Sequence, residues 1–298
     1  MKINIRPKCA FNYDKGFVRI EYNEIEDMVY FIPCCNARPK KYIEPIAYRS
    51  EYFINNINEC IEKYKNFSMF DLNNYYIGDC IKSLRIESNM KKLCNNYDYN
   101  KKLSIIENSV SHGCNLKCIM CVLGKSVKRK EQEISKKIYE YLKDLKLDTI
   151  VTGTCGEPFV DKNTILDLAK NNKSKTIYIT TNGTLLNKND IEELAKCNVK
   201  LSVSIDGITK ETYEKIRVGA NFEKVLQNII MLNKFKILSH VNYVVQPLNL
   251  LERPDIFFDG LGIKVDYLFD YSFFNDKQCI YKLASLKQTK SYLYNEIK

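Results

Sequence analysis

The sequence has no long hydrophobic run and no apolar segment at its amino terminus. Residues 1–16 include charged side chains and lack the apolar core of a signal peptide. The longest apolar run near this end, Met28–Pro33, is far shorter than the roughly 20 residues that cross a bilayer. We therefore expect no secretory signal and no membrane partner, and we expect the protein to be cytoplasmic.

Histidine is scarce, with two residues, whereas cysteine is abundant, with twelve. Disulfides are rare in the cytosol, so this many cysteines points to metal or cluster ligation. The net charge of +10 is a mild basic bias. Because the lysines are scattered among Asn, Tyr and Ile, we assign this charge to solvated surface and expect no nucleic-acid partner. The hydrophobic content of 45% is enough for a sizeable core.

Residues 105–272 alternate short β-branched runs with amphipathic stretches, which is the pattern of βα units and a parallel sheet. The predicted strands are Ile105–Val110, Thr149–Gly153, Thr176–Thr181, Val199–Ile205, Ser239–Val245 and Val265–Tyr271. Six strands are too few for the eight-stranded barrel, so we predict an α/β fold with a partial (β/α)6 barrel. We expect an α+β accessory region over residues 1–104 and a helical extension over residues 273–298.

Helices are predicted between these strands, from apolar side chains that recur on one face. Three such patterns cover residues 134–145, 165–169 and 222–230. Asp190, followed by Glu193, resembles a capping box that opens a further helix. Thr209 is the predicted cap of the next helix, and Pro254 is the predicted first-turn residue of the last one.

The strongest chemical signal is a cysteine triad in residues 111–121, with the sequence SHGCNLKCIMC. Cys114, Cys118 and Cys121 have the spacing C-x3-C-x2-C and lie in the loop that leaves the first predicted strand. A [4Fe–4S] cube needs a ligand at each of four irons, and this loop supplies three. Structural zinc normally takes four protein ligands, and no His or Cys pair follows Cys121 closely. We therefore favour an iron–sulfur loop over zinc or over cysteines that are merely buried.

This arrangement resembles the radical SAM superfamily, whose signature is such a triad directly after the first strand of a partial barrel. Met120 stands where family members usually carry an aromatic residue. The resemblance implies that Cys114, Cys118 and Cys121 bind a [4Fe–4S] cluster, and that S-adenosylmethionine (SAM) binds its open iron. Electron transfer would then cleave the sulfonium, giving methionine and a 5′-deoxyadenosyl radical that abstracts a substrate hydrogen.

Three further segments resemble motifs of the same family, in the expected order. They are TGTCGEP at 152–158, TTNGTLL at 180–186 and SVSIDG at 202–207. Cys155 replaces a glycine that is usual in the first motif, where Glu157 is expected to meet the methionine ammonium. For Arg217, a pair with the SAM carboxylate and a solvated place on its helix both remain open. The residues that the resemblance assigns to SAM are Gly153, Gly156, Glu157, Thr181, Asn182, Ser204, Asp206 and Arg217.

The cysteines of the amino-terminal region are similar to a SPASM or twitch segment, which holds auxiliary iron–sulfur clusters. In most members that segment follows the barrel, whereas here it precedes it. The resemblance implies one auxiliary cluster, with one of two adjacent cysteines as a ligand, and the alternative is a set of buried thiols. The cysteines concerned are Cys9, Cys34, Cys35, Cys80 and Cys94.

The sequence therefore predicts a radical SAM enzyme with a SPASM-like accessory region. Peptide or protein modification is the expected reaction class, and a sugar or another small molecule is the alternative substrate. The expected electron donor is a flavodoxin or a ferredoxin. A hypothesis from another class is a zinc-binding nucleic-acid module, against which the predicted barrel and SAM motifs argue.

Overall fold

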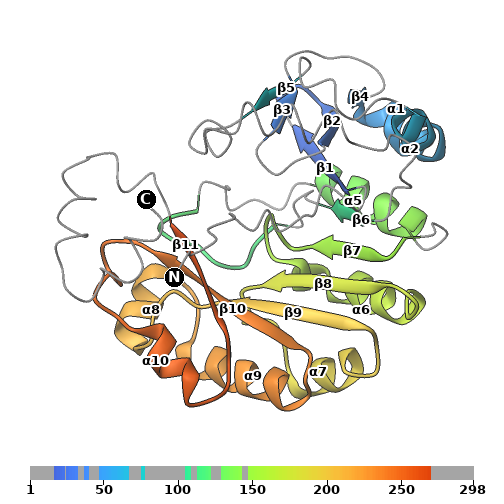
Figure 1. The fold of residues 1–298 in the computed structure, drawn as a ribbon. Helices are drawn as coiled ribbons and strands as arrows, with labels where there is room; N and C mark the ends of the chain where they lie inside the picture. The colour runs from blue at the N-terminus through green and yellow to red at the C-terminus, as the bar shows by residue number, and fades with distance from the viewer. Residues whose placement is uncertain are drawn as a thin grey trace, which may run out of the picture.

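The computed structural model describes residues 17–23, 25–32, 37–39, 47–66, 75–77, 105–108, 113–121, 129–142 and 147–269. Nine described strands form one sheet, in the order β11-β10-β9-β8-β7-β6-β1-β2-β4. Figure 1 shows that this sheet is curved, with β4 and β11 far apart at its two ends. Two short strands, β3 (Ala37–Pro39) and β5 (Tyr75–Ile77), pair separately.

Six parallel strands follow one another both along the chain and in space. They are β6 (Ile105–Asn108), β7 (Thr149–Thr152), β8 (Thr176–Thr181), β9 (Val199–Ser204), β10 (Leu238–Val245) and β11 (Val265–Phe269). The helices of this part are α5 (Arg129–Leu142), η3 (Pro158–Asp161), α6 (Lys162–Asn171), α7 (Lys188–Leu194), α8 (Lys210–Ile216), α9 (Phe222–Lys234) and α10 (Pro254–Asp259). The predicted α/β fold with a partial (β/α)6 barrel is confirmed.

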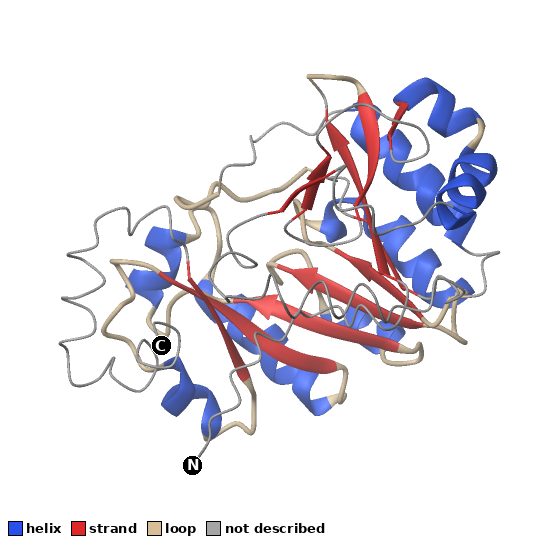
Figure 2. Cartoon of the chain, turned by 45° about the horizontal axis from the view of Figure 1, so that its top comes forward, coloured by secondary structure: helices blue, strands red, loops and turns tan. Residues whose placement is uncertain are grey.

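The helices cover one face of the parallel strands (Figure 2). Strand residues such as Ile179, Val203 and Val241 are buried in one hydrophobic core with Val225 and Ile229 of α9. Because side chains alternate along a strand, the residues between these face the other side of the sheet. That side is the inner face of the partial barrel, so the core determines which strand residues line it.

Two of the predicted helix starts agree with the structure, and one differs from it. Thr209 caps α8 by accepting a hydrogen bond from the Thr212 amide, and Pro254 lies in the first turn of α10. The capping box of α7 is formed by Asn187 and Asp190, so the prediction that Asp190 opens this box was wrong by three residues. Asp190 instead lies at the third helical position, where its carboxylate accepts from the Asn187 amide.

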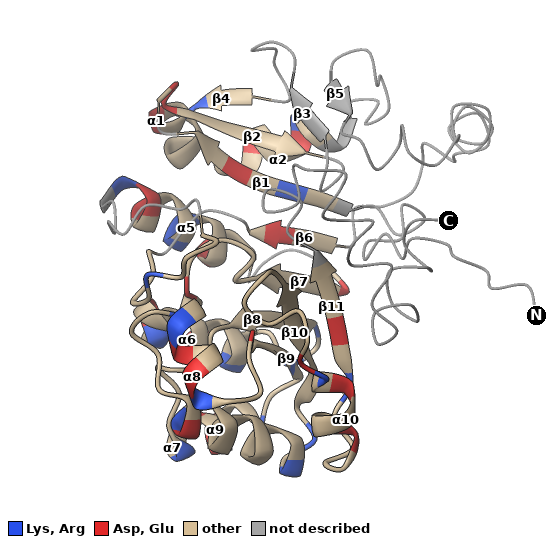
Figure 3. Cartoon of the chain, turned by 90° about the vertical axis from the view of Figure 1, so that its left-hand side faces the viewer, with Lys and Arg blue, Asp and Glu red and all other residues tan. Residues whose placement is uncertain are grey.

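The described residues before the barrel extend the same sheet (Figures 1 and 3). Their elements are β1 (Phe17–Asn23), β2 (Met28–Ile32), β4 (Ala47–Arg49), α1 (Ser50–Asn55) and α2 (Ile57–Asn66). β1 pairs in parallel with β6, and β2 and β4 continue in antiparallel order. The sheet thus runs across the predicted boundary at residue 104, and the division into separate regions stays a prediction.

Aromatic side chains form the apolar centre of this amino-terminal part. Phe31 stacks on Tyr64 with 4.8 Å between ring centroids, and it also contacts Tyr48 and Phe53. All four side chains are fully buried. Aromatic pairs of this kind add to the stabilisation from buried apolar area, so the region has a core of its own that joins the core of the barrel.

Some expectations lie outside the described residues. The helical extension over residues 273–298 is one, and the amino-terminal cysteines Cys9, Cys34, Cys35, Cys80 and Cys94 are another. Within the described part of the chain, every helix is too short or too polar to cross a membrane.

Asp27, in the turn between β1 and β2, joins the amino-terminal part to α5. Its Oδ1 atom lies 2.7 Å from Lys130 Nζ and accepts hydrogen bonds from the hydroxyls of Ser50, at 2.6 Å, and Tyr22, at 2.9 Å. The bond from Lys130, followed by the bond from Ser50, lowers the pKa of Asp27 to about 2. The ionised form of Asp27 therefore stabilises the folded protein.

We expect Asp27→Asn to destabilise the protein at neutral pH, with a difference from the wild type that shrinks in acid. Asn tolerates the positive φ of this position, 53°, so the turn is kept while the charge is lost. Because folding lowers the pKa, this stabilisation is present above the unfolded pKa near 3.8 and is lost as pH falls towards 2. Urea unfolding at several pH values would measure the difference. The control is Asp259→Asn, an exposed carboxylate without an ion pair among the described residues; a pH-independent difference at Asp27 would contradict the assignment.

Candidate functional site

The cysteine loop, residues 113–121, follows β6 and is fixed by main-chain hydrogen bonds to two other segments. The carbonyl of Gly113 accepts from the Glu157 amide at 2.7 Å, which joins the loop to the segment after β7. The amides of Lys117 and Ile119 donate to the carbonyls of Val218 and Ile216, at 2.9 and 3.0 Å. These bonds hold the loop at the carboxyl ends of the strands, where parallel α/β sheets bind their ligands.

The three cysteines of the triad lie together on this loop and form no disulfide. Cys114 and Cys118 are half-buried, and Cys121 is exposed. Cys114 Sγ accepts hydrogen bonds from the Leu116 amide at 3.4 Å and from Asn182 Nδ2 at 3.8 Å. Cys118 Sγ accepts one from Arg217 Nη1 at 3.9 Å. Donors of this kind favour thiolates, the form in which cysteine binds iron.

Burial opposes the effect of these donors on the pKa values of the thiols. It raises the pKa of the Cys114 thiol and of the Cys118 thiol, and at Cys118 the charge of Arg217 opposes the rise. Among the described residues, no three His, Cys, Asp or Glu side chains are arranged to share one metal ion. A [4Fe–4S] cluster makes a different demand, because each thiolate binds a different iron. Three soft thiolate donors on one loop fit such a cluster in their chemistry.

Glu157 is fully buried between the segments that follow β7 and β8. Its Oε1 accepts from the Thr181 hydroxyl at 2.7 Å and from the Phe159 amide at 3.1 Å, and its Oε2 accepts from the Asn182 amide at 2.6 Å. Burial raises the pKa of this carboxyl, and the three donors oppose the rise. The structure thus shows Glu157 holding the two strand ends together; its contact with SAM stays a prediction.

Gly153, the first residue after β7, adopts a conformation that requires glycine. Its φ is +83°, and a Cβ atom built there would lie 1.9 Å from the carbonyl oxygen of Thr180. The close approach of these two backbones brings the segment 153–157 against the end of β8. Gly156, also with positive φ, completes the turn that leads to Glu157. The two glycines therefore shape the turn, and their part in SAM binding stays a prediction.

Asn182 connects the end of β8 to the cysteine loop. Besides its contact with Cys114, Asn182 Nδ2 donates to Asn115 Oδ1 at 3.0 Å, and Asn115 in turn donates to the Thr184 hydroxyl at 2.8 Å. Asn182 Oδ1 accepts from the Thr184 amide and hydroxyl. Thr181, the preceding residue, donates to the Glu157 carboxylate. Of the two predicted residues of this motif, Asn182 therefore contacts the loop directly, and Thr181 is connected to it through Glu157.

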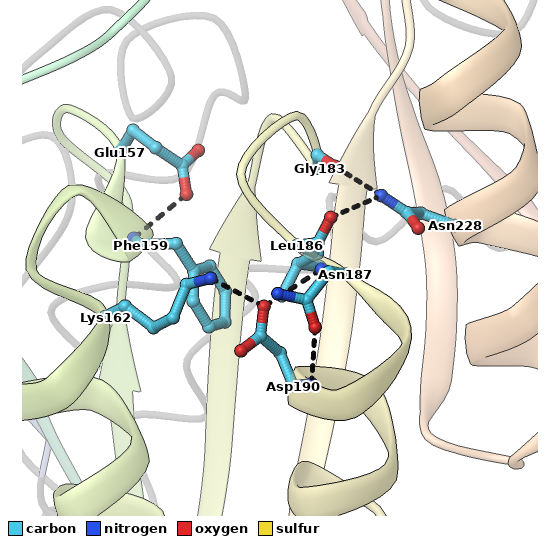
Figure 4. A network of polar contacts seen from close by, with 8 residues as sticks. All are labelled: Glu157, Phe159, Lys162, Gly183, Leu186, Asn187, Asp190 and Asn228. Carbon is cyan, nitrogen blue, oxygen red and sulfur yellow. Dashed lines mark hydrogen bonds and ion pairs between the residues drawn. The ribbon is translucent and has the colours of Figure 1, made fainter.

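The turn that carries Asn182 is supported from the helix side (Figure 4). The side-chain amide of Asn228, on α9, donates to the carbonyls of Gly183 and Leu186, at 2.9 and 3.1 Å. Beside it, Lys162 lies 2.7 Å from Asp190 Oδ2 and so ties η3 and α6 to the start of α7. These contacts leave the turn little freedom to move away from the loop.

Asp206 and Arg217 form a buried ion pair, with 2.7 Å between Oδ2 and Nε. Asp206 is completely buried and also accepts from the Val244 amide, at the end of β10. Burial raises the pKa of Asp206, and the charge of Arg217 opposes that rise. Of the two alternatives for Arg217, the solvated place on its helix is wrong, because the side chain is buried between Asp206 and Cys118. Direct contacts of Asp206 and Arg217 with SAM stay predictions.

Ser204 belongs to a set of polar side chains on the inner face of the partial barrel. It lies opposite Asn242 in the β9–β10 register, and the Asn242 side chain donates to the Ser202 hydroxyl at 3.2 Å. The hydroxyls of Ser202 and Thr180 lie 3.0 Å apart. His240 continues the row through Asn242 Oδ1 at 3.1 Å, and it is not packed in the core. Ser204 is half-buried, so its hydroxyl can reach a ligand.

Sequence reasoning missed several polar residues around the loop. Asn115 and Thr184 lie inside motifs that were recognised, but nothing in the spacing marks them as partners. Tyr213 is buried next to Arg217, Asp206 and Cys118, and its hydroxyl has no hydrogen-bond partner among the described residues. Gln246, directly after β10, is fully buried with both amide atoms unpaired within the described chain. No sequence pattern distinguishes these two from ordinary core or turn residues.

Comparisons with known proteins identify relatives of this chain. The curated relatives include GTP 3′,8-cyclase of Clostridium botulinum, 29% identical over 140 residues, and a probable GTP 3′,8-cyclase of Methanococcus maripaludis, 31% identical over 141 residues. Each match covers 44% of this chain and 44% or 46% of the relative, so the chain spans less than half the length of these proteins.

The fold also resembles a solved structure. SuiB of Streptococcus suis, bound to its precursor peptide SuiA, matches with a TM-score of 0.50 and 18% identity, over 84% of this chain and 59% of that one. At this identity the likeness concerns the fold. The sequence model of the radical SAM superfamily matches residues 108–259, more than half of the chain. With the cysteine loop and the three strand-end motifs inside that range, the chain belongs to the radical SAM superfamily, a family of enzymes.

Proposed function

We propose that this protein is a radical SAM enzyme that binds a [4Fe–4S] cluster through Cys114, Cys118 and Cys121 and takes SAM at the open iron. The observation that carries the proposal is a cysteine loop hydrogen-bonded to the segments after β7 and β8 and to the end of α8. When bound, the two groups supply one-electron cleavage of the SAM sulfonium to methionine and a 5′-deoxyadenosyl radical, which removes a hydrogen atom from the substrate.

The residues of this chain have two kinds of task in that reaction. Arg217 and Asn182 donate to the sulfurs of Cys118 and Cys114, so they stabilise negative charge on the thiolates. Glu157 and Asp206 are buried and bonded to main-chain amides, so they hold the strand ends that face SAM. Ser204 is half-buried and offers a hydroxyl at the same edge, where the glycine turn 153–156 also lies.

A peptide or protein is the substrate class that we propose first. Thr180, Ser202, Asn242 and His240 form a hydrogen-bonded row on the inner face, and burial lowers the pKa of His240, which favours its neutral form. Such a row suits the amides and hydroxyls of a peptide, whereas a triphosphate calls for several Arg or Lys side chains. The GTP 3′,8-cyclases among the relatives support the alternative, a small-molecule substrate. If the reduced holoenzyme consumes GTP, the small-molecule alternative is correct.

Replacing Cys114, Cys118 and Cys121 with Ala should abolish SAM cleavage. No side chain of the loop would then hold the iron, and we expect the reconstituted protein to contain about four iron atoms fewer per chain. Iron analysis and chromatography of 5′-deoxyadenosine after dithionite reduction measure both effects. Cys197→Ala is the control, because this cysteine lies outside the loop. Undiminished 5′-deoxyadenosine from the triple variant would overturn the proposal.

Glu157→Gln should weaken SAM binding by roughly ten- to a hundredfold, the equivalent of one charge-assisted hydrogen bond. The amide keeps the shape but has one acceptor oxygen, whereas Glu157 accepts on two. Anaerobic calorimetry gives the affinity, and the melting temperature reports the loss of internal bonds. Exposed Glu211→Gln serves as the control. A lower melting temperature with unchanged affinity would leave Glu157 a structural role only.

We also propose one auxiliary cluster, held by Cys9, Cys80, Cys94 and either Cys34 or Cys35, in a SPASM-like region. The sequence pattern supports this proposal. The cysteines themselves lie outside the described residues. We expect the triad variant to retain about four iron atoms, and to lose them when Cys9, Cys80 and Cys94 are also replaced by Ala. If the reconstituted triad variant contains no iron, these cysteines are thiols that hold no cluster.

A further inference from the structure

The outer side of the cysteine loop forms a small surface together with the end of α8. Residues 117–119 and 216–218 run antiparallel, since the amide of Lys117 donates to the Val218 carbonyl and that of Ile119 to the Ile216 carbonyl. Cys118 thus lies opposite Arg217, and these two side chains meet on the inner side. The two neighbours of Cys118 on the loop, Lys117 and Ile119, are exposed.

This outer side is apolar at its centre and positive at its rim. Ile119 is 46% exposed and Val218 is 42% exposed, although both are large hydrophobic side chains. Lys117, on the loop, and Lys215, in the last turn of α8, are exposed beside them. Of the nearby acids, Glu214 is half-buried and accepts from the Phe222 amide, and Glu211 lies a turn earlier on α8. We call Lys117, Ile119, Lys215 and Val218 the loop patch.

We propose that the loop patch is the docking surface of an acidic electron-donor protein. The inference rests on the proposed function, in which the cluster must receive an electron from outside the chain. One electron leaves the donor, which is oxidised by one electron, and the iron–sulfur centre is reduced by one. Cys118 lies between two residues of the patch in the sequence, so a donor seated there lies next to the loop that would hold the centre.

The chemistry of the patch favours this kind of partner. Apolar groups inside a charged rim are the anatomy of a protein–protein contact. Opposite charges on the two partners speed their encounter, and the net charge of +10 acts in the same direction on an acidic protein. Four side chains make a small contact, and redox encounters are among the smallest and weakest of specific interfaces. An acidic flavodoxin has the matching charge, and it serves as the probe.

The test compares two double variants of the reconstituted holoenzyme. Lys117→Gln/Lys215→Gln removes two charges from the loop patch. Lys173→Gln/Lys196→Gln removes two charges from exposed lysines that precede β8 and β9, at the opposite ends of the strands. We expect the first variant to bind the flavodoxin roughly five- to twentyfold more weakly at low salt and the second to bind it as the wild type does. The difference should disappear near 0.5 M salt, because exposed charges are then screened.

Dithionite separates this inference from the proposed function, because a small reductant needs no docking surface. We expect the loop-patch variant to form 5′-deoxyadenosine at the wild-type rate with dithionite and more slowly with reduced flavodoxin. Val218→Ser should weaken flavodoxin binding at all salt concentrations, since it removes apolar contact. Equal affinity in both double variants, or equal losses, would overturn the docking proposal. Absence of 5′-deoxyadenosine from the wild type with dithionite would instead refute the proposed function.

Discussion

The ion pair between Arg217 and Asp206 is the contact on which the geometry around the cysteine loop depends. Both side chains are buried, so removing one would leave the other charge unpaired, at a cost of roughly 3–5 kcal/mol. Asp206 is bonded to the end of β10 through the Val244 amide, and its carbonyl accepts from Asn249. Arg217 extends the pair to Cys118. This ion pair thus links the cysteine loop to the ends of β9 and β10.

Glu157 has the corresponding place on the other side of the loop. Its carboxylate joins the segments after β7 and β8, and its own amide donates to Gly113 at the start of the loop. The loop is therefore fixed at Gly113 by the Glu157 amide and at Cys118 by Arg217, the partner of Asp206. Main-chain hydrogen bonds to the carboxylates of Glu157 and Asp206 fix both side chains before a ligand binds. Oε2 of Glu157 accepts one of these bonds and keeps acceptor capacity for a ligand.

The sequence predicted the barrel well because its signals are local. Each strand is a short β-branched run, and the predicted bounds that fall on described residues were found within one residue. The capping box of α7 was misplaced, because Asp190 and Glu193 fit the same pattern as Asn187 and Asp190. The partners in the site could not be predicted, since Arg217 and Cys118 are 99 residues apart and Asn182 and Cys114 are 68 apart. Such pairs are fixed by the packing of whole βα units, which no spacing within one motif encodes.

The pairing of β1 with β6 was also beyond local patterns, and it matters for the site. β6 has four residues, and a strand this short with one unpaired edge would be a weak support. Its partners are β7 on one side and β1 on the other, with Glu107 in register with both Val151 and Arg19. The cysteine loop therefore starts from a strand that is hydrogen-bonded along both edges. Through β1, the aromatic core around Phe31 belongs to the same sheet. Loosening the amino-terminal part would then free one edge of β6 and weaken the point from which the loop begins.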